Sequence, residues 1–174
     1  IRIAHVEAGQ RSGNNEMQEE VNRILTDNLS SILFTTSKEA TKNLINENFN
    51  KKIIFEVGDV MFDSVKYFKK KITKSLYNDY ALLTIHRAEN VDEKNKLRLL
   101  VEGFIKLSEK TKIILPIHPR TKKNLIKYNF FAKLQKNLKI LPPQPYLELL
   151  RLINGSNYVI TDSGGIQKEA YFLK

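Results

Sequence analysis

The sequence contains no cysteine, which excludes disulfide bonds and metal sites built on cysteine. It also contains no long apolar run and no signal-peptide pattern among its first residues. We therefore expect no membrane insertion and a cytoplasmic location. No internal repeat or low-complexity tract stands out, and 174 residues are enough for one domain or for parts of two.

Acidic residues are fewer than basic ones, 19 against 29, and the net charge is +10. A basic protein suits nucleic acid, a membrane surface or phosphorylated small molecules. The lysines, however, are scattered and are not interleaved with aromatic residues as in a base-stacking surface. We interpret them as solvated helix faces and expect no nucleic-acid partner.

Apolar segments of strand length recur along the chain and are separated by segments with helical patterns. The expected strands are residues 1–6, 32–36, 53–57, 80–85, 113–117, 138–141 and 157–160. The expected helices lie near residues 16–30, 37–45, 60–68, 92–104, 121–136 (helical or irregular), 146–153 and from 166 onward. Apolar strands that alternate with helices predict an α/β fold whose parallel sheet is covered on both faces.

The alternation pauses over the polar, lysine-rich stretch 58–78, which we interpret as the connection between two α/β units. The chain opens directly in a strand and closes inside an apparent helix. Both units are therefore expected to be incomplete, as in a piece of a longer protein.

Two local patterns make sharper predictions about helices. Asp92 is placed to cap the helix that carries Leu97. The first helix has an apolar face made of Val21, Ile24, Leu25 and Leu29.

The most informative segment is a strand that runs into Ser163-Gly164-Gly165 and then into a helix. Glycines let the backbone approach a ligand, and free N–H groups at a helix start attract anions such as phosphate. Glu169 lies on the second turn of that helix. A carboxylate there would repel phosphate, so we interpret it as an acceptor for sugar hydroxyls. An ordinary strand–turn–helix corner remains the alternative.

In open α/β sheets, ligands bind at the carboxyl ends of the strands, so the polar residues that follow each strand are the candidates. Those residues are His5, Glu7, Gly9 and Arg11, then Glu19 and Glu20 at a helix start, then His86, Arg87 and Glu89, and then His118 and Arg120. All three histidines of the chain lie at this edge. The His-Arg pairs are suited to diphosphate oxygens.

A metal site is a competing interpretation, because His5 and Glu7 alternate on a strand and His86 is followed by Glu89. No pair at HExxH spacing supports it, so we expect no catalytic metal. Ser163 lacks the nucleophile-elbow pattern, and no Ser-His-Asp triad is predicted.

The same residues resemble the non-hydrolysing UDP-N-acetylglucosamine 2-epimerases. The matching blocks occur in the family's order and cover essentially the whole chain. They are His5-Val6-Glu7-Ala8-Gly9 with Arg11, Glu19-Glu20-Val21-Asn22-Arg23, Val57-Gly58 with Asp63, Ile85-His86-Arg87-Ala88-Glu89-Asn90, Ile117-His118-Pro119, Pro143 with Tyr146-Leu147, and Thr161-Asp162-Ser163-Gly164-Gly165-Ile166-Gln167 with Glu169-Ala170.

The resemblance implies two Rossmann-like parallel-sheet domains in a GT-B-like arrangement, with the active site in the cleft between them. Residues 1–64 resemble the later part of the N-terminal domain, and residues 65–174 the earlier part of the C-terminal, UDP-binding domain. It also implies a homodimer when full length, no cofactor, and UDP-GlcNAc and UDP-ManNAc as ligands. The family's catalytic aspartate loop is expected before Ile1.

The family inverts C2 of the sugar by eliminating UDP to 2-acetamidoglucal and adding it back. By resemblance, Glu7, Glu19 and His86 are catalytic, although base and acid cannot be told apart. Ser163, Gly164 and Gly165 match diphosphate contacts, and Glu169 matches a ribose-binding carboxylate. Arg11, Arg87 and His118 are the remaining substrate-binding candidates, the last two matching a regulatory UDP-GlcNAc site of some bacterial members.

Gln18, Asp59 and Pro145 depart from the family pattern, and none of them removes a residue assigned to chemistry. The Glu19-Glu20 pair also suits an ordinary helix N-terminus. Three other functions compete: a hydrolysing 2-epimerase that releases ManNAc and UDP, a GT-B glycosyltransferase, and a catalytically incomplete nucleotide-sugar-binding fragment. The Asp162-Ser163-Gly164-Gly165 turn favours the non-hydrolysing type, because hydrolysing relatives tend towards Asn-Ser-Ser.

Overall fold

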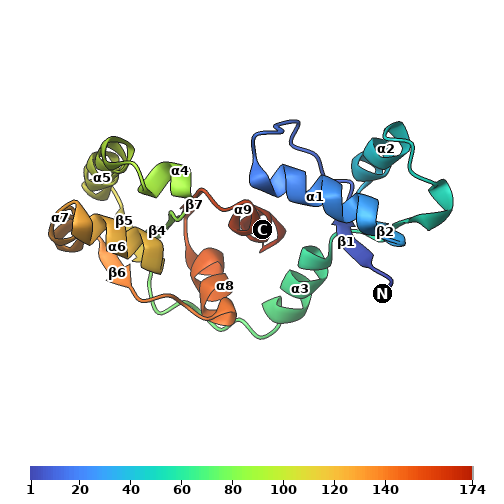
Figure 1. Ribbon diagram of the computed structural model, residues 1–174. Coiled ribbons are helices and arrows are strands. Elements are labelled where there is room, and N and C mark those ends of the chain that lie inside the picture. The colour runs from blue at the N-terminus through green and yellow to red at the C-terminus, as the bar shows by residue number, and fades with distance from the viewer. Residues whose placement is uncertain (174) are drawn as a thin grey trace. The chain divides into compact units, whose positions relative to one another are not determined.

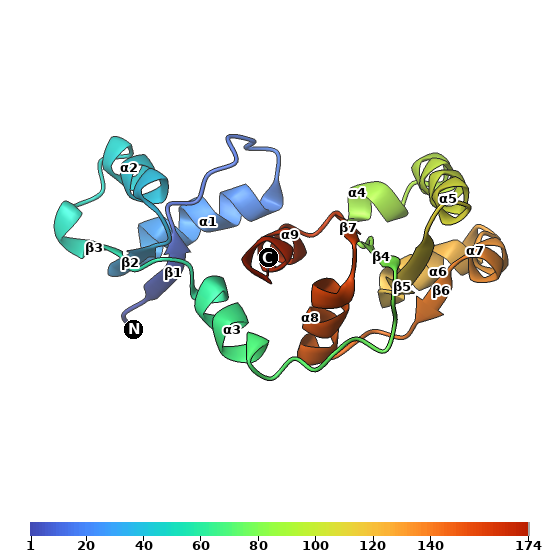
Figure 2. The same ribbon diagram turned by 180° about the vertical axis from the view of Figure 1, so that it is seen from behind.

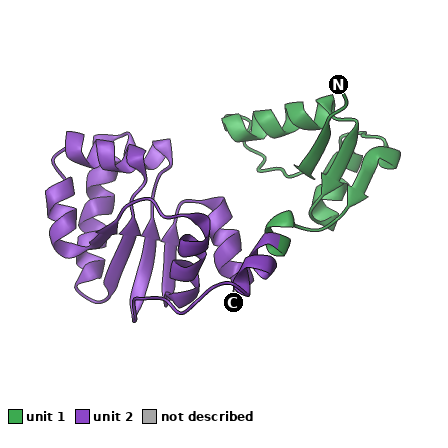
Figure 3. Cartoon of the chain, turned by 90° about the horizontal axis from the view of Figure 1, so that it is seen from below, with its two compact units in different colours: residues 1–63 green, residues 64–174 purple. Residues whose placement is uncertain are grey.

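The computed structural model describes residues 1–173 of the chain (Figure 1). The chain divides into two compact units, Ile1–Asp63 and Ser64–Lys174 (Figure 3). That division lies one residue from the domain boundary expected from the sequence. Each unit is built around its own parallel sheet.

Unit 1 contains a three-stranded parallel sheet in the order β1-β2-β3. Its elements are β1 (Ala4–Ala8), α1 (Gln18–Leu29), β2 (Ile32–Thr35), α2 (Lys38–Asn46), a 3-10 turn (Lys51–Ile53) and β3 (Ile54–Glu56). The Ser37 side chain caps α2 by accepting a hydrogen bond from the Ala40 N–H at 3.2 Å. The fully buried core of this unit is small and consists of Ala8, Leu33 and Leu44.

Helix α1 is where expected, but its apolar face is not its buried face. Val21, Leu25 and Leu29 are exposed, by 42%, 55% and 69%. The buried side chains of the helix are instead Glu20 and Asp27, at 1% and 0% exposure. These two carboxylates accept hydrogen bonds from the loop that follows β1, so this side of the helix packs on that loop.

Unit 2 contains a four-stranded sheet in the order β6-β5-β4-β7, with every pair parallel. Figures 1 and 2 show its elements from opposite sides. They are α3 (Val60–Lys69, which begins in unit 1), β4 (Tyr80–Thr84), α4 (Ala88–Val91), α5 (Lys94–Ser108), β5 (Lys112–Pro116), α6 (Pro119–Lys127), α7 (Phe131–Asn137), β6 (Lys139–Leu141), α8 (Tyr146–Gly155), β7 (Tyr158–Thr161) and α9 (Gly164–Leu173).

Both faces of this sheet are covered, as the unbroken apolar strands predict (Figure 3). Ala81 and Leu83 of β4 lie in the core that α5 closes with Leu97. Successive side chains of a strand point to opposite faces, so Tyr80 lies on the other face. There its hydroxyl donates a hydrogen bond to the Leu152 carbonyl of α8 at 2.7 Å.

The strand order reverses at β4: β5 and β6 follow on one side of it, and β7 pairs on the other. A parallel sheet opens a crevice at its carboxyl edge where the order reverses. The loops after β4 and β7 therefore form the most favourable ligand-binding position of unit 2.

Asp92 does not cap the helix that carries Leu97. It ends α4, and α5 begins after Glu93 without a side-chain cap. The Asp92 carboxylate instead accepts two hydrogen bonds from Arg120, at 2.9 and 2.5 Å, and one from Asn124 at 2.9 Å. These long-range partners lie 28 and 32 residues away, which is why a local cap pattern pointed to the wrong contact.

Candidate active site

The loops after β4 and β7 are held together by the carboxylate of Asp162. It accepts hydrogen bonds from the backbone N–H of His86 at 3.0 and 3.1 Å and from that of Arg87 at 3.0 Å. The Asn90 side-chain amide donates a further hydrogen bond at 3.0 Å. One side chain from the β7 end thus fixes the backbone of the β4 end across 76 residues of sequence.

Electrostatics keep Asp162 ionised. Burial alone raises the pKa of a carboxyl group, because it disfavours the charged form. Here the hydrogen bonds from Asn90 and from the N–H groups of Arg87 and His86 outweigh it, and the pKa of Asp162 lies below its ordinary value. An ionised acceptor holds these donors more firmly than a neutral group does.

The turn between β7 and α9 is held by side-chain hydrogen bonds and leaves open space at the start of the helix. The Thr161 hydroxyl shares a hydrogen bond of 2.6 Å with the Thr84 hydroxyl of β4. It also accepts a hydrogen bond from the Ser163 N–H at 3.0 Å. The Ser163 hydroxyl accepts one from the Ile166 N–H at 3.4 Å and so caps α9. A Cβ built on Gly164 would meet no atom within 4 Å, which leaves open space beside the helix N-terminus.

His86 and His118 lie close together at the same edge of the sheet. Their ring centroids are 5.6 Å apart, and both residues line a cavity of about 280 Å³. Pro143, Gln144 and Leu149 also line that cavity. His118 also caps α6, since its Nδ1 accepts a hydrogen bond from the Arg120 N–H at 3.2 Å.

Glu169 faces inward from α9 and is 7% exposed. Burial raises its pKa above the ordinary value, and a hydrogen bond from the Tyr146 hydroxyl partly opposes that rise. Burial and the neighbouring carboxylate in turn raise the pKa of Tyr146. The Tyr146 hydroxyl therefore already donates to Glu169 in the way that a sugar hydroxyl would.

In unit 1 the backbone around Glu7 departs from regular strand geometry. Glu7 has φ of 71°, and the pairing of β1 with β2 shifts register between Val6 and Ala8. A non-glycine residue in this region is strained, and such residues concentrate at functional sites. The bulge lies near the carboxyl end of β1, at the residue that the family resemblance predicts to be catalytic.

Asp27 holds the segment around Glu7 from the middle of α1. Its fully buried carboxylate lies 2.5 Å from His5 Nδ1 and 2.8 Å from an Arg11 nitrogen, and it accepts a hydrogen bond from the Gly9 N–H at 3.1 Å. The residues before and after Glu7 are thereby tied to a single acceptor. Asp27 was not among the sequence-based candidates.

Arg11 is engaged by the protein itself. Its guanidinium makes two hydrogen bonds to Glu47, at 2.7 and 2.6 Å, and a third to the Gln10 carbonyl at 2.8 Å. The hydrogen bond to Glu47 raises the pKa of Arg11 above its ordinary value. Arg11 braces the loop after β1, so its assignment as a substrate-binding residue stays a prediction that this geometry does not favour. Arg87, by contrast, is exposed and lies 3.5 Å from Glu89.

The two adjacent glutamates at the start of α1 have different environments. Glu20 is buried and accepts hydrogen bonds from the N–H groups of Ser12 and Gly13 at 2.8 and 3.0 Å. Burial raises the pKa of Glu20, but these hydrogen bonds and that from Arg23 outweigh it and lower the pKa overall. Glu19 is exposed and available to a ligand. The structure thus separates a loop-fixing glutamate from the one predicted to be catalytic.

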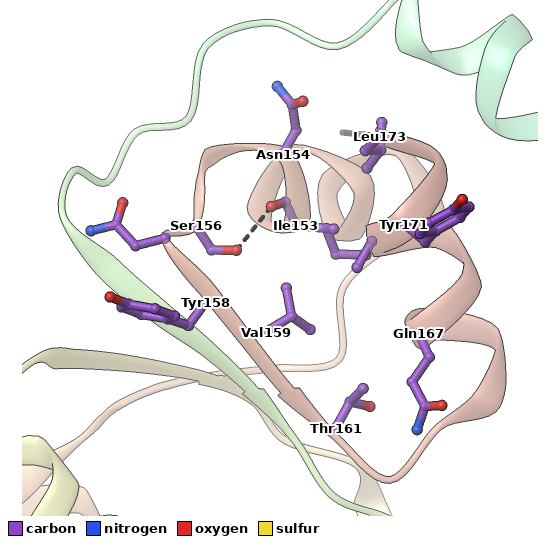
Figure 4. A pocket seen from close by; sticks show the side chains of 11 residues that line it. Ile153, Asn154, Ser156, Tyr158, Val159, Thr161, Gln167, Tyr171 and Leu173 are labelled. Carbon is purple, nitrogen blue, oxygen red and sulfur yellow. Dashed lines mark hydrogen bonds between the residues drawn. The ribbon is translucent and has the colours of Figure 1, made fainter.

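A larger cavity, about 440 Å³, lies elsewhere, between α8, β7 and α9 (Figure 4). Tyr158, Thr161 and Tyr171 line it, and none of the candidate site residues does. It adjoins the edge strand β7 rather than the carboxyl ends of the strands, so we do not assign the chemistry to it. Among residues 1–173 no group of three or more metal-ligating side chains comes together, and no described helix is long and apolar enough to cross a membrane.

Residues 1–174 match the family described as UDP-N-acetylglucosamine 2-epimerase over their full length. The chain belongs to that family. A Methanococcus maripaludis protein named UDP-N-acetylglucosamine 2-epimerase homolog is 50% identical to it, covering 100% of this chain and 51% of the relative. A Pseudomonas aeruginosa UDP-2,3-diacetamido-2,3-dideoxy-D-glucuronate 2-epimerase is 41% identical, covering 99% and 50%.

A solved structure gives the same result. The crystal structure of Methanocaldococcus jannaschii UDP-GlcNAc 2-epimerase in complex with UDP-GlcNAc and UDP matches with a TM-score of 0.92 and 44% identity, over 99% of this chain and 51% of that one. The family and the α/β fold with parallel sheets predicted from the sequence are confirmed. The chain spans about half the length of the curated relatives it matches.

Proposed function

We propose that the protein containing this chain is a non-hydrolysing UDP-N-acetylglucosamine 2-epimerase that interconverts UDP-GlcNAc and UDP-ManNAc. The observation that carries the proposal is the junction of His86 with the Ser163-Gly164 turn through Asp162, within a chain of this family. A homodimer and a cytoplasmic location remain predictions from the sequence.

Unit 2 supplies the nucleotide site in this proposal. The diphosphate takes the open space beside Gly164, where the start of α9 and its N–H groups favour an anion. Ribose hydroxyls take over the hydrogen bonding of Glu169 now provided by Tyr146. Proline, leucine and a glutamine amide in the nearby 280 Å³ cavity suit a flat, polar-edged base.

Unit 1 supplies groups for proton transfer. The C2 proton of the sugar is only weakly acidic, because no carbonyl is attached to that carbon. We infer that a carboxylate removes it while UDP leaves C1, and that UDP adds back as a proton returns on the other face. Glu7, on its strained backbone, and the exposed Glu19 are the two carboxylates we assign to these steps. His86 acts beside the departing diphosphate.

The relatives of this chain are named for different sugars. One relative of this chain is named for UDP-2,3-diacetamido-2,3-dideoxy-D-glucuronate, at 41% identity, against 50% for the one named for UDP-N-acetylglucosamine. We favour the simpler sugar on that difference. A uronate carboxyl would need a cationic partner; in unit 2, Arg87 and the Asp92-bound Arg120 are the arginines beside the two histidines.

Product analysis tests the proposal. Incubated with UDP-GlcNAc, the protein is expected to give UDP-ManNAc in a reversible mixture, resolved by ion-exchange chromatography and ¹H NMR. Free ManNAc with UDP would establish the hydrolysing type instead. Activity on the diacetamido uronate alone would reassign the substrate, and an acceptor-dependent release of UDP would indicate a glycosyltransferase.

A further inference from the structure

Asp162 contacts His86 in two distinct ways. Its oxygens accept the His86 and Arg87 backbone N–H groups, and its Oδ1 also lies 3.2 Å from Nδ1 of the His86 ring. The carboxylate side chain is 11% exposed, whereas the imidazole is 40% exposed. The Nδ1 side of the His86 imidazole therefore lies against the buried carboxylate, and part of the ring remains exposed to a ligand.

We propose that Asp162 is a positioning residue that sets the tautomer of His86. With an ionised carboxylate at Nδ1, the ring proton of neutral His86 stays on Nδ1, and Nε2 is left as the nitrogen that faces the substrate. Nε2 then carries the proton that passes to the diphosphate as it leaves C1, and takes that proton back as the diphosphate adds again. The proposal rests on the epimerase function inferred above.

The surroundings of His86 leave Asp162 as the group that performs this task. His118 faces it from the β5 end, with the ring centroids 5.6 Å apart, but His118 Nδ1 is occupied by the Arg120 N–H. Arg87 next to it carries a positive charge and lies near Glu89. Neither neighbouring basic group offers an acceptor that would hold a proton on His86 Nδ1.

The substitution Asp162→Asn makes a specific prediction about the ring. The Oδ2 position receives three donors, the His86 and Arg87 N–H groups and the Asn90 amide, so the amide oxygen of the new side chain is expected to take that place. Its NH₂ group then faces His86 Nδ1 and donates to it. The proton moves to Nε2, the tautomer that an unconstrained histidine also prefers, and the catalytic nitrogen is blocked.

Nitrogen-15 NMR of the imidazole measures this directly in the protein that contains this chain. The wild-type His86 ring is expected as the Nδ1–H tautomer, with its signal assigned by loss in His86→Gln. In Asp162→Asn it is expected as Nε2–H, with kcat lowered at least about tenfold and KM nearly unchanged. A wild-type ring in the Nε2–H form would overturn the proposal without any variant being needed.

The matched control is Asp92→Asn, at another carboxylate near the same loops that accepts three side-chain hydrogen bonds but does not contact His86. It is expected to leave the His86 tautomer unchanged. In a His86→Gln background, Asp162→Asn should cause little further loss of turnover, because the two residues act as one unit. Full additivity would refute positioning through His86. An inactive wild-type protein with the Nδ1–H tautomer would overturn the epimerase function alone.

Discussion

Glu7→Gln is expected to lower the turnover of UDP-GlcNAc by about 10²-fold or more, as the loss of acid–base catalysis typically does. The change keeps the size of the side chain and removes only its capacity to take up a proton. Glu7 is chosen because its backbone has φ of 71° at a bulge near the carboxyl end of β1, a strained geometry of the kind that concentrates at functional sites. Steady-state kinetics on the protein that contains this chain measures the effect.

Glu19→Gln is expected to have a similar effect, since the second proton transfer needs a second carboxylate. Glu39→Gln on α2 is the matched control, an exposed glutamate in the first turn of its helix like Glu19. It should leave turnover within twofold of wild type. Wild-type turnover in both Glu7→Gln and Glu19→Gln would show that the assignment of these carboxylates is wrong.

Gly9→Ala is expected to destabilise unit 1 by about 3 kcal/mol, the upper part of the range for overpacked sites. Gly9 has φ of +75°, and a Cβ there would lie 2.3 Å from the Ala40 carbonyl oxygen and 2.9 Å from Leu44 Cγ. The clash is with the backbone of α2, which cannot withdraw without uncovering Leu44. Chemical denaturation, followed by a probe in unit 1, gives the free energy of unfolding.

Gly13→Ala separates the two causes of that loss of stability, the left-handed backbone conformation and the close contact with α2. Gly13 has nearly the same φ, +73°, but a Cβ there would meet nothing within 4 Å. It should cost only the left-handed backbone term, about 1 kcal/mol. If the two variants were equally stable, close packing against α2 would not be what requires glycine at position 9.

Much of the fold followed from short-range patterns, for reasons visible in the structure. β4 is buried along its whole length and its neighbours are all parallel, so an unbroken apolar run identified it correctly. The rule that ligands meet strand ends likewise brought His86 and Ser163 into one region, because the strands that precede them are hydrogen-bonded neighbours.

What the sequence did not predict depends on contacts between distant residues. Asp27 lies in the middle of a helix, 22 residues from His5, and no local pattern marks it as the acceptor for the loop after β1. Asp162 follows β7 directly, but the partners that give it its role, the His86 and Arg87 N–H groups, lie 76 and 75 residues away.

The family establishes what the chain is related to, and the geometry establishes which groups are strained, buried or open. Glu7, Glu19, His86 and the nucleotide-contacting residues therefore stay predictions, each tied to an observed feature of its surroundings.

Binding of the nucleotide at the Ser163–Gly165 turn is the step on which the epimerase function depends, and calorimetry with UDP alone measures it most directly. Wild-type protein is expected to bind UDP at one site per chain, and Gly164→Val at least about tenfold more weakly, a loss of about 1.4 kcal/mol. The added valine side chain enters space that is open in the protein. The unfolding temperature of the Gly164→Val variant should therefore hardly differ from that of the wild type. Tyr158→Ala in the larger cavity should bind UDP like wild type. Undiminished affinity in Gly164→Val, or a loss confined to Tyr158→Ala, would contradict a nucleotide site at this turn.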